Sequence, residues 1–192
     1  MNEELLKEIK GLLPWVIVAA IAVGGYYGVK HHIAAKKVAA SEAVVNAYTA
    51  EELEEAVSKF GSTASGGALK IRLAKKYFDA GRYQEALDQY EALVKDAPDG
   101  FADIPVVGRA QALEALGKFA EAQKAFDDFV AANPKHYLTL MAQLGAARTL
   151  AEGGDAKAAL DRLAALKAST TDELSKSRIE TTEDCIRRMA KK

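Results

Sequence analysis

The side chains that could support catalysis or metal binding are few and widely scattered along the sequence. The strongest candidates are three histidines and one cysteine, His31, His32, His136 and Cys185. They do not show the spacing of a zinc site or of a nucleophile–base pair. No glycine-rich loop follows a predicted strand, as a phosphate site would require. The sequence therefore predicts neither an enzyme nor a cofactor or metal site.

Composition narrows the remaining classes of function. The chain carries 26 Lys and Arg against 27 Asp and Glu, and its net charge is −1. A chain without excess positive charge has no general attraction for a phosphate backbone, so nucleic acid is not an expected partner. Apolar residues make up 49% of the chain while aromatic residues make up only 7%, which favours closely packed helices over sheets. We therefore expect a helical protein that does not bind nucleic acid.

Residues that could bind a partner recur along the chain in three columns. Two columns are mainly apolar and one is made of long polar side chains: Ala68, Ile104 and Met141; Ile71, Val107 and Leu144; and Lys75, Gln111 and Arg148. Together they predict a groove with an apolar floor, suited to an extended or helical peptide with apolar anchors. The alternative is that the apolar residues pack on the N-terminal helix pair or on the last helix.

The elements that would position these columns are helix pairs that recur every 36 or 37 residues. The segment GRYQEALDQYEALVKDAP, from Gly81 to Pro98, returns as GKFAEAQKAFDDFVAANP, from Gly117 to Pro134. The first copy resembles a tetratricopeptide repeat through Leu73, Ala74, Tyr77, Gly81, Ala86, Tyr90 and Pro98. This resemblance predicts an all-α solenoid over residues 67–171, with repeats at 67–100, 103–136 and 140–171.

Two further features concern packing within this solenoid. Gly108 and Gly145 hold equivalent places in the first helices of the second and third repeats, where they predict close contact between helices. Residues 172–192 are expected to form a last helix that covers the open end of the stack, as terminal caps do. Its covering residues would be Leu174, Ile186 and Met189.

The N-terminal part predicts a membrane anchor. After a tail at residues 1–11, residues 12–29 contain no charge and would reach about 27 Å as a helix, close to the roughly 30 Å of a hydrocarbon core. Trp15 lies near one end of this span and Tyr26 and Tyr27 near the other, as at two interfaces. A cleavable signal peptide is the competing interpretation. The lysines around the span leave its orientation open.

Three small residues of the span, Ala20, Gly24 and Gly28, recur every four positions on one stripe. Such a stripe lets a second membrane helix approach closely, so a homo-oligomer through the span is a further possibility. Beyond the span, residues 30–66 predict a connecting helix pair. The pattern Thr49-Ala-Glu-Glu52 is a capping box that starts the second helix of this pair, which would end near Phe60.

This layout resembles the YfgM-like family of bacteria, most specifically over SKFGSTASGGALKIRLAKKYFDAGRYQEALDQYEAL, residues 58–93. Members of that family are ancillary subunits of the Sec translocon, with a tetratricopeptide-like domain behind one membrane helix. The resemblance implies a single-pass protein of the bacterial inner membrane with its C-terminal domain in the periplasm. It also implies two kinds of partner, translocon subunits and a membrane-anchored periplasmic folding factor.

The function expected from these features is that of a membrane-tethered protein–protein interaction module. The resemblance to the YfgM-like family implies that it assists translocation of envelope proteins or chaperones them in the periplasm. The alternative is a structural scaffold of another envelope machine, such as one for outer-membrane, division or pilus assembly.

Overall fold

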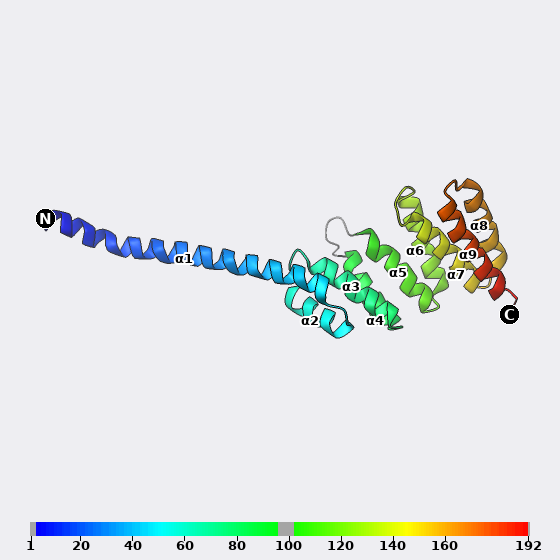
Figure 1. The fold of residues 1–192 in the computed structure, drawn as a ribbon, viewed down its shortest axis with the longest axis horizontal. Coiled ribbons are helices and arrows are strands. Elements are labelled where there is room, and N and C mark those ends of the chain that lie inside the picture. Colours follow the sequence, from blue (N-terminus) through cyan, green and yellow to red (C-terminus); the bar gives the residue numbers. More distant parts are fainter. Residues whose placement is uncertain (1–2, 96–101, 192) are drawn as a thin grey trace.

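The computed structural model describes residues 3–95 and 102–191, with the backbone alone for residues 3–14. This part of the chain forms helices only: α1 (Glu3–Asn46), α2 (Ala50–Phe60), α3 (Gly66–Asp79), α4 (Tyr83–Lys95), α5 (Asp103–Ala115), α6 (Phe119–Ala132), α7 (Thr139–Glu152), α8 (Ala156–Ser169) and α9 (Glu173–Met189). Consecutive helices from α2 to α9 pack side by side into a stack, and α1 projects from one end of it as a rod (Figure 1).

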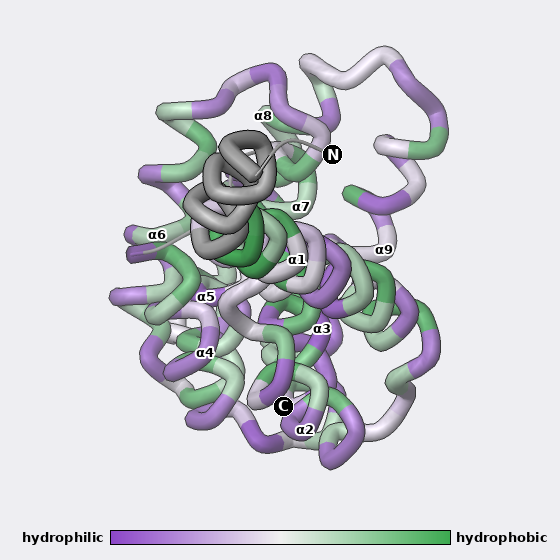
Figure 2. The backbone as a smooth tube through the Cα atoms, turned by 90° about the vertical axis from the view of Figure 1, so that its left-hand side faces the viewer, coloured by the Kyte–Doolittle hydropathy of each residue, from purple (hydrophilic) through white to green (hydrophobic). Residues whose placement is uncertain are grey.

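The rod is one unbroken helix that continues past residue 29, as the absence of a helix breaker there predicts. Its segment Trp15–Asn46 is long and apolar enough to cross a membrane, and the most apolar part is not buried against the rest of the chain. Figure 2, in which α1 points toward the viewer, shows this hydrophobic stretch followed by a more polar one where the helix reaches the stack. Only there does α1 contribute to the core, through Ala40 and the adjoining Ala47, which are 0% and 7% exposed.

The predicted capping box at the start of α2 is present. The Thr49 hydroxyl accepts a hydrogen bond from the Glu52 amide at 3.1 Å. The Glu52 carboxylate in turn accepts from the amides of Tyr48 at 2.7 Å and Thr49 at 3.1 Å. These amides lower the pKa of Glu52, the Tyr48 amide most. The box therefore marks the start of α2, where the otherwise free amides of Thr49 and Glu52 are both hydrogen-bonded.

Three glycines close the first helix of each repeat with the same turn. Gly81, Gly117 and Gly154 have φ angles of 75°, 73° and 104°, which side chains with a Cβ rarely adopt. The residue after each glycine donates a backbone hydrogen bond of 2.8–2.9 Å to a carbonyl five residues earlier. This is the hydrogen bond of a Schellman cap. Pro98, expected to end the first repeat, lies outside the described residues.

The prediction of close packing at Gly108 and Gly145 is confirmed. A Cβ at Gly108 of α5 would lie 2.6 Å from ring atoms of Tyr90 in α4, and one at Gly145 of α7 would lie 2.5 Å from the ring of Phe126 in α6. Each ring therefore occupies the space that the glycine leaves free. The same two places in α8 and α9 hold Leu163 and Thr182, which are both buried.

Helix α9 consequently takes the position that the first helix of a further repeat would take, and it packs on both α8 and α7. The expected covering residues are partly wrong. Ile186 is buried and Met189 is half-buried, but Leu174 is 72% exposed. The buried stripe of α9 instead runs through Ile179, Thr182 and Ile186 at helical spacing, and Leu174 lies off this stripe, in the first turn.

Candidate partner groove

The first candidate site is a cavity of about 300 Å³ between the first helices of the three repeats, which we call the apolar hollow. Its lining joins α3, α4, α5, α7 and the residue before α7: Lys75, Phe78, Asp79, Tyr90, Ile104, Val107, Gly108, Gln111, Leu138 and Met141. Eight of these ten residues lack a charged side chain. The hollow therefore offers a mainly apolar surface.

The packing of Tyr90 against Gly108 forms one wall of this hollow. Because Gly108 has no side chain, the Tyr90 ring lies directly on α5 beside Val107, which is only 2% exposed. Burial, and to a smaller extent the charge of Asp79, raises the pKa of Tyr90 to about 12. The phenol is therefore neutral at physiological pH, and the wall that it forms carries no charge.

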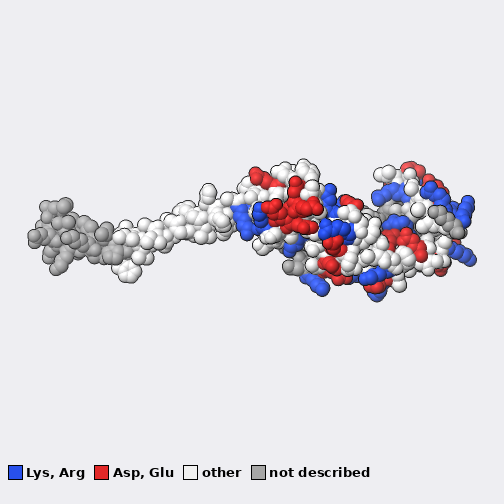
Figure 3. Space-filling model, turned by 90° about the horizontal axis from the view of Figure 1, so that it is seen from below, with Lys and Arg blue, Asp and Glu red and all other residues white. Residues whose placement is uncertain are grey.

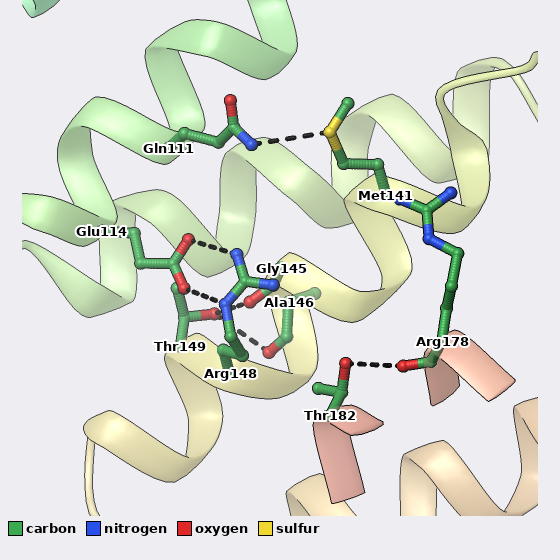
Figure 4. A network of polar contacts seen from close by, with 9 residues as sticks. All are labelled: Gln111, Glu114, Met141, Gly145, Ala146, Arg148, Thr149, Arg178 and Thr182. Atoms are coloured by element: carbon green, nitrogen blue, oxygen red, sulfur yellow. Dashed lines mark hydrogen bonds and ion pairs between the residues drawn. The ribbon is translucent and has the colours of Figure 1, made fainter. Parts of the chain in front are cut away.

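The polar edge of the apolar hollow is weakly held. Lys75 Nζ lies 2.9 Å from both carboxylate oxygens of Asp79, but the two side chains are 68% and 49% exposed. An ion pair so open to water contributes little to stability, so little is lost when it opens. Gln111 donates a hydrogen bond from Nε2 to the Met141 sulfur at 3.5 Å (Figure 4). Both long side chains can therefore turn toward a ligand at low cost.

A second cavity of about 460 Å³, the charged hollow, adjoins the first. Both are lined by Phe78 and Gln111, and the charged hollow adds Glu114, Ala115, Gly117, Phe119, Arg148 and Glu152. Its central interaction is a two-pronged ion pair between α7 and α5. Arg148 donates from Nε and Nη2 to the two oxygens of Glu114 at 2.8 and 2.9 Å (Figure 4). The Glu114 side chain is only 11% exposed, so this pair is shielded from solvent more than the ion pair of Lys75.

The charge of this second hollow is unbalanced. Burial raises the pKa of Glu152 above its ordinary value of 4.5, and the neighbouring Glu114 raises it further, against a smaller opposing effect of Arg148. One guanidinium therefore faces two carboxylates, and a cationic group brought into the hollow would relieve this imbalance. We call the two adjoining hollows together the partner groove.

The structure brings most of the expected site residues to this groove. Lys75, Ile104, Val107, Gln111 and Met141 line the apolar hollow, and Arg148 lines the charged one. Ala68 and Ile71 are half-buried and line neither. Leu144 is only 5% exposed, because it packs in a cluster with Leu163 of α8 and Ile179 and Ile186 of α9. Leu144 therefore packs on the last helix, as the alternative interpretation predicted, and is not part of the groove.

Sequence reasoning missed four prominent groove residues: Phe78, Asp79, Glu114 and Glu152. Each lies three or four residues after a member of the expected polar row, that is, one helical turn further along the same face. Extending the three columns by one turn would have found them. Within the described residues, no group of three or more His, Cys, Asp or Glu side chains could hold a metal ion.

Comparison with known proteins identifies the architecture. A family model described as tetratricopeptide repeat matches residues 77–144. The helical stack is a tetratricopeptide-repeat solenoid.

Two crystal structures share this solenoid fold, both of nearly identical TPR-like repeats of a putative kinesin light chain from Podosopora anserina. One, a point-substituted form, aligns with a TM-score of 0.62 at 21% identity over 83% of this chain and 86% of that chain. The other aligns with a TM-score of 0.60 at 21% identity over 83% of this chain and 87% of that chain. No curated protein matches the chain. Tetratricopeptide-repeat solenoids generally bind proteins along the face lined by their first helices, which is where the partner groove lies.

Proposed function

We propose that the protein is a membrane-tethered interaction module whose partner groove binds a segment of another protein. The observation that carries this proposal is the pair of adjoining hollows on the first helices of a tetratricopeptide-repeat solenoid. The tether is α1, whose apolar part is exposed and long enough to cross a membrane. On the face seen in Figure 3, this part is an uncharged rod, and charged side chains appear near the start of the stack.

The chemistry of the groove indicates what kind of segment it takes. The apolar hollow would receive one or two apolar side chains, because its floor and walls offer no unpaired buried charge. The charged hollow would receive a lysine or arginine of the same segment between Glu114 and Glu152. The favoured ligand is therefore a segment with apolar anchors followed by a basic residue.

The resemblance to the YfgM-like family supports a more specific form of this proposal. In that form the protein is an ancillary subunit of the Sec translocon in a bacterial inner membrane, and the solenoid lies in the periplasm. Its partners are then translocon subunits, a membrane-anchored periplasmic folding factor or emerging envelope proteins. A C-terminal phosphatase fusion that is active only outside the cytoplasm tests the topology. A stable but inactive fusion would exclude the periplasmic form.

A photocrosslinking amino acid at Ile104 or Met141, both half-buried in the apolar hollow, tests the groove itself. In native membranes we expect adducts with other proteins at these positions. The matched control is Leu174, which is apolar and 72% exposed but lies away from the groove. Equal adducts at Leu174, or none at the groove positions, would contradict binding in the groove. A single stoichiometric adduct would favour a fixed scaffold over client binding.

A further inference from the structure

One face of α1 carries an exposed line of residues that the chain's own core does not use. It runs at alternating spacings of four and three through Tyr27, His31, Ala34, Val38, Ser41 and Val45, and we call it the α1 seam. All six are exposed, and Val38 and Val45 are 59% and 65% exposed. The side of α1 that packs on α2 and α3 is a different one, marked by the fully buried Ala40. The seam meets the stack at its edge, where the hydroxyl oxygens of Ser41 and Ser65 lie 3.4 Å apart.

The spacing of the seam is that of a left-handed coiled coil. Alternating steps of three and four average 3.5 residues, which keeps a stripe facing a partner helix along a left-handed supercoil. In the heptad notation the β-branched Val38 and Val45 stand at a, and the small residues Ala34 and Ser41 stand at d. A shallow surface hollow of about 470 Å³ lies along this stretch, lined by Lys37, Val38, Ser41, Glu42, Val45 and Asn46.

Two charges beside the seam decide which partner fits. Lys37 stands at g and Glu42 at e of the following heptad. In a parallel pair of coiled helices a g residue faces the e residue five positions later on the partner. Two copies of α1 would therefore place Lys37 of each opposite Glu42 of the other, on both sides of the seam. Within the described part of the chain, neither residue forms an ion pair.

We propose that the α1 seam is a homodimer interface, in which two copies of the chain pair in parallel along α1 just outside the membrane. The parallel direction is the one that a shared membrane imposes, since both chains enter it from the same end. An antiparallel pair would set g positions against g and e against e, so it would not bring Lys37 opposite Glu42. Val38 and Val45 of the seam lie on another side of α1 than the buried Ala40, so the two solenoids would lie on the outside of the pair.

The line of the seam extends into the apolar part of α1 through Gly24 and Ala20, two members of the small-residue stripe expected from the sequence. Glycine is unfavourable in a helix interior. Yet a Cβ at Gly24 would meet no atom of this chain within 4 Å, so packing within the chain gives no reason for its small size. Close approach of the second helix does give one.

Disulfide crosslinking in native membranes tests the contact. In a Cys185→Ser background, Val38→Cys should give a disulfide-linked dimer of the chain on mild oxidation, because residues at a face each other across the pair. His32→Cys, which is also exposed but lies on another side of α1, is the matched control. We expect a yield about fivefold higher at Val38, because a disulfide needs Cα atoms within about 7 Å. Equal yields at the two positions, or adducts with another protein alone, would overturn the proposal.

A charge exchange tests the identity of the partner. Lys37→Glu or Glu42→Lys alone should lower the yield of the Val38→Cys disulfide-linked dimer about tenfold. In a symmetric pair each single change replaces two exposed ion pairs by two repulsive contacts. The double exchange, Lys37→Glu with Glu42→Lys, should restore it. Failure to restore would overturn pairing with a second copy, since only a copy of the same chain carries both changes. Alkaline extraction of the same membranes tests the tether separately, so loss of anchoring is not mistaken for loss of dimerisation.

Discussion

Replacing Gly145 by alanine would test whether the aromatic–glycine pairs hold the stack together. The added Cβ would lie 2.5, 2.7 and 2.8 Å from three atoms of the Phe126 ring, whereas ordinary carbon contacts lie near 3.5–4.0 Å. The ring would have to move by about 1 Å, although its side chain is fully buried. Such overpacking costs about 1–3 kcal/mol, while alanine regains about 1 kcal/mol of helix propensity. We therefore expect a net loss of about 1 kcal/mol.

Thermal unfolding of the full chain in detergent, followed by circular dichroism, measures this loss as a fall in Tm of about 2–4 °C. The exposed substitution Ala164→Gly calibrates helix propensity alone. Exchanging the ring for a smaller side chain should relieve the clash. One repeat later the same two places hold Leu163 and Thr182, so a leucine there goes together with a residue larger than glycine. The pair Phe126→Leu with Gly145→Ala should therefore lose less stability than the two single changes added. A higher Tm for Gly145→Ala would refute the steric argument, because only helix propensity would then operate.

Two further predictions concern charge and the end of the stack. Since the native state raises the pKa of Glu152, wild-type stability should fall as pH rises through and above 4.5, and Glu152→Gln should remove that component. Urea midpoints of the two proteins should thus differ more at about pH 7 than at about pH 4, and a difference independent of pH would contradict the assignment. Ile179→Ala should lower the free energy of unfolding by about 2–5 kcal/mol, because the Ile179 side chain is fully buried. Leu174→Ala should change stability by less than about 0.5 kcal/mol, and a large effect there would show that it packs after all.

Features set by local backbone geometry could be predicted from the sequence. Glycine at 81, 117 and 154 marks turns because few other residues adopt a positive φ. The pattern of Thr49 and Glu52 marks a helix start because both hydrogen bonds span three residues. These signals need no knowledge of the rest of the molecule.

The groove could be predicted in part. Its columns follow from the repeat period, which places Lys75, Gln111 and Arg148 at equivalent points of three successive helices. The ion pair between Glu114 and Arg148 could not be predicted, because it joins residues 34 positions apart on two different helices. The separation of an apolar from a charged hollow likewise depends on which side chains meet between helices.

The sequence by itself determined that the chain is a helical repeat stack behind a long apolar helix, because periodicity and turn chemistry are local properties. Only the tertiary structure decided which apolar residues remain open to a partner. Leu144 has the spacing of a groove residue, yet α9 covers it, while Leu174 has the composition of a covering residue and stays in water. The physical reason is that a repeat specifies one face of each helix, whereas burial depends on what the neighbouring helix brings to that face.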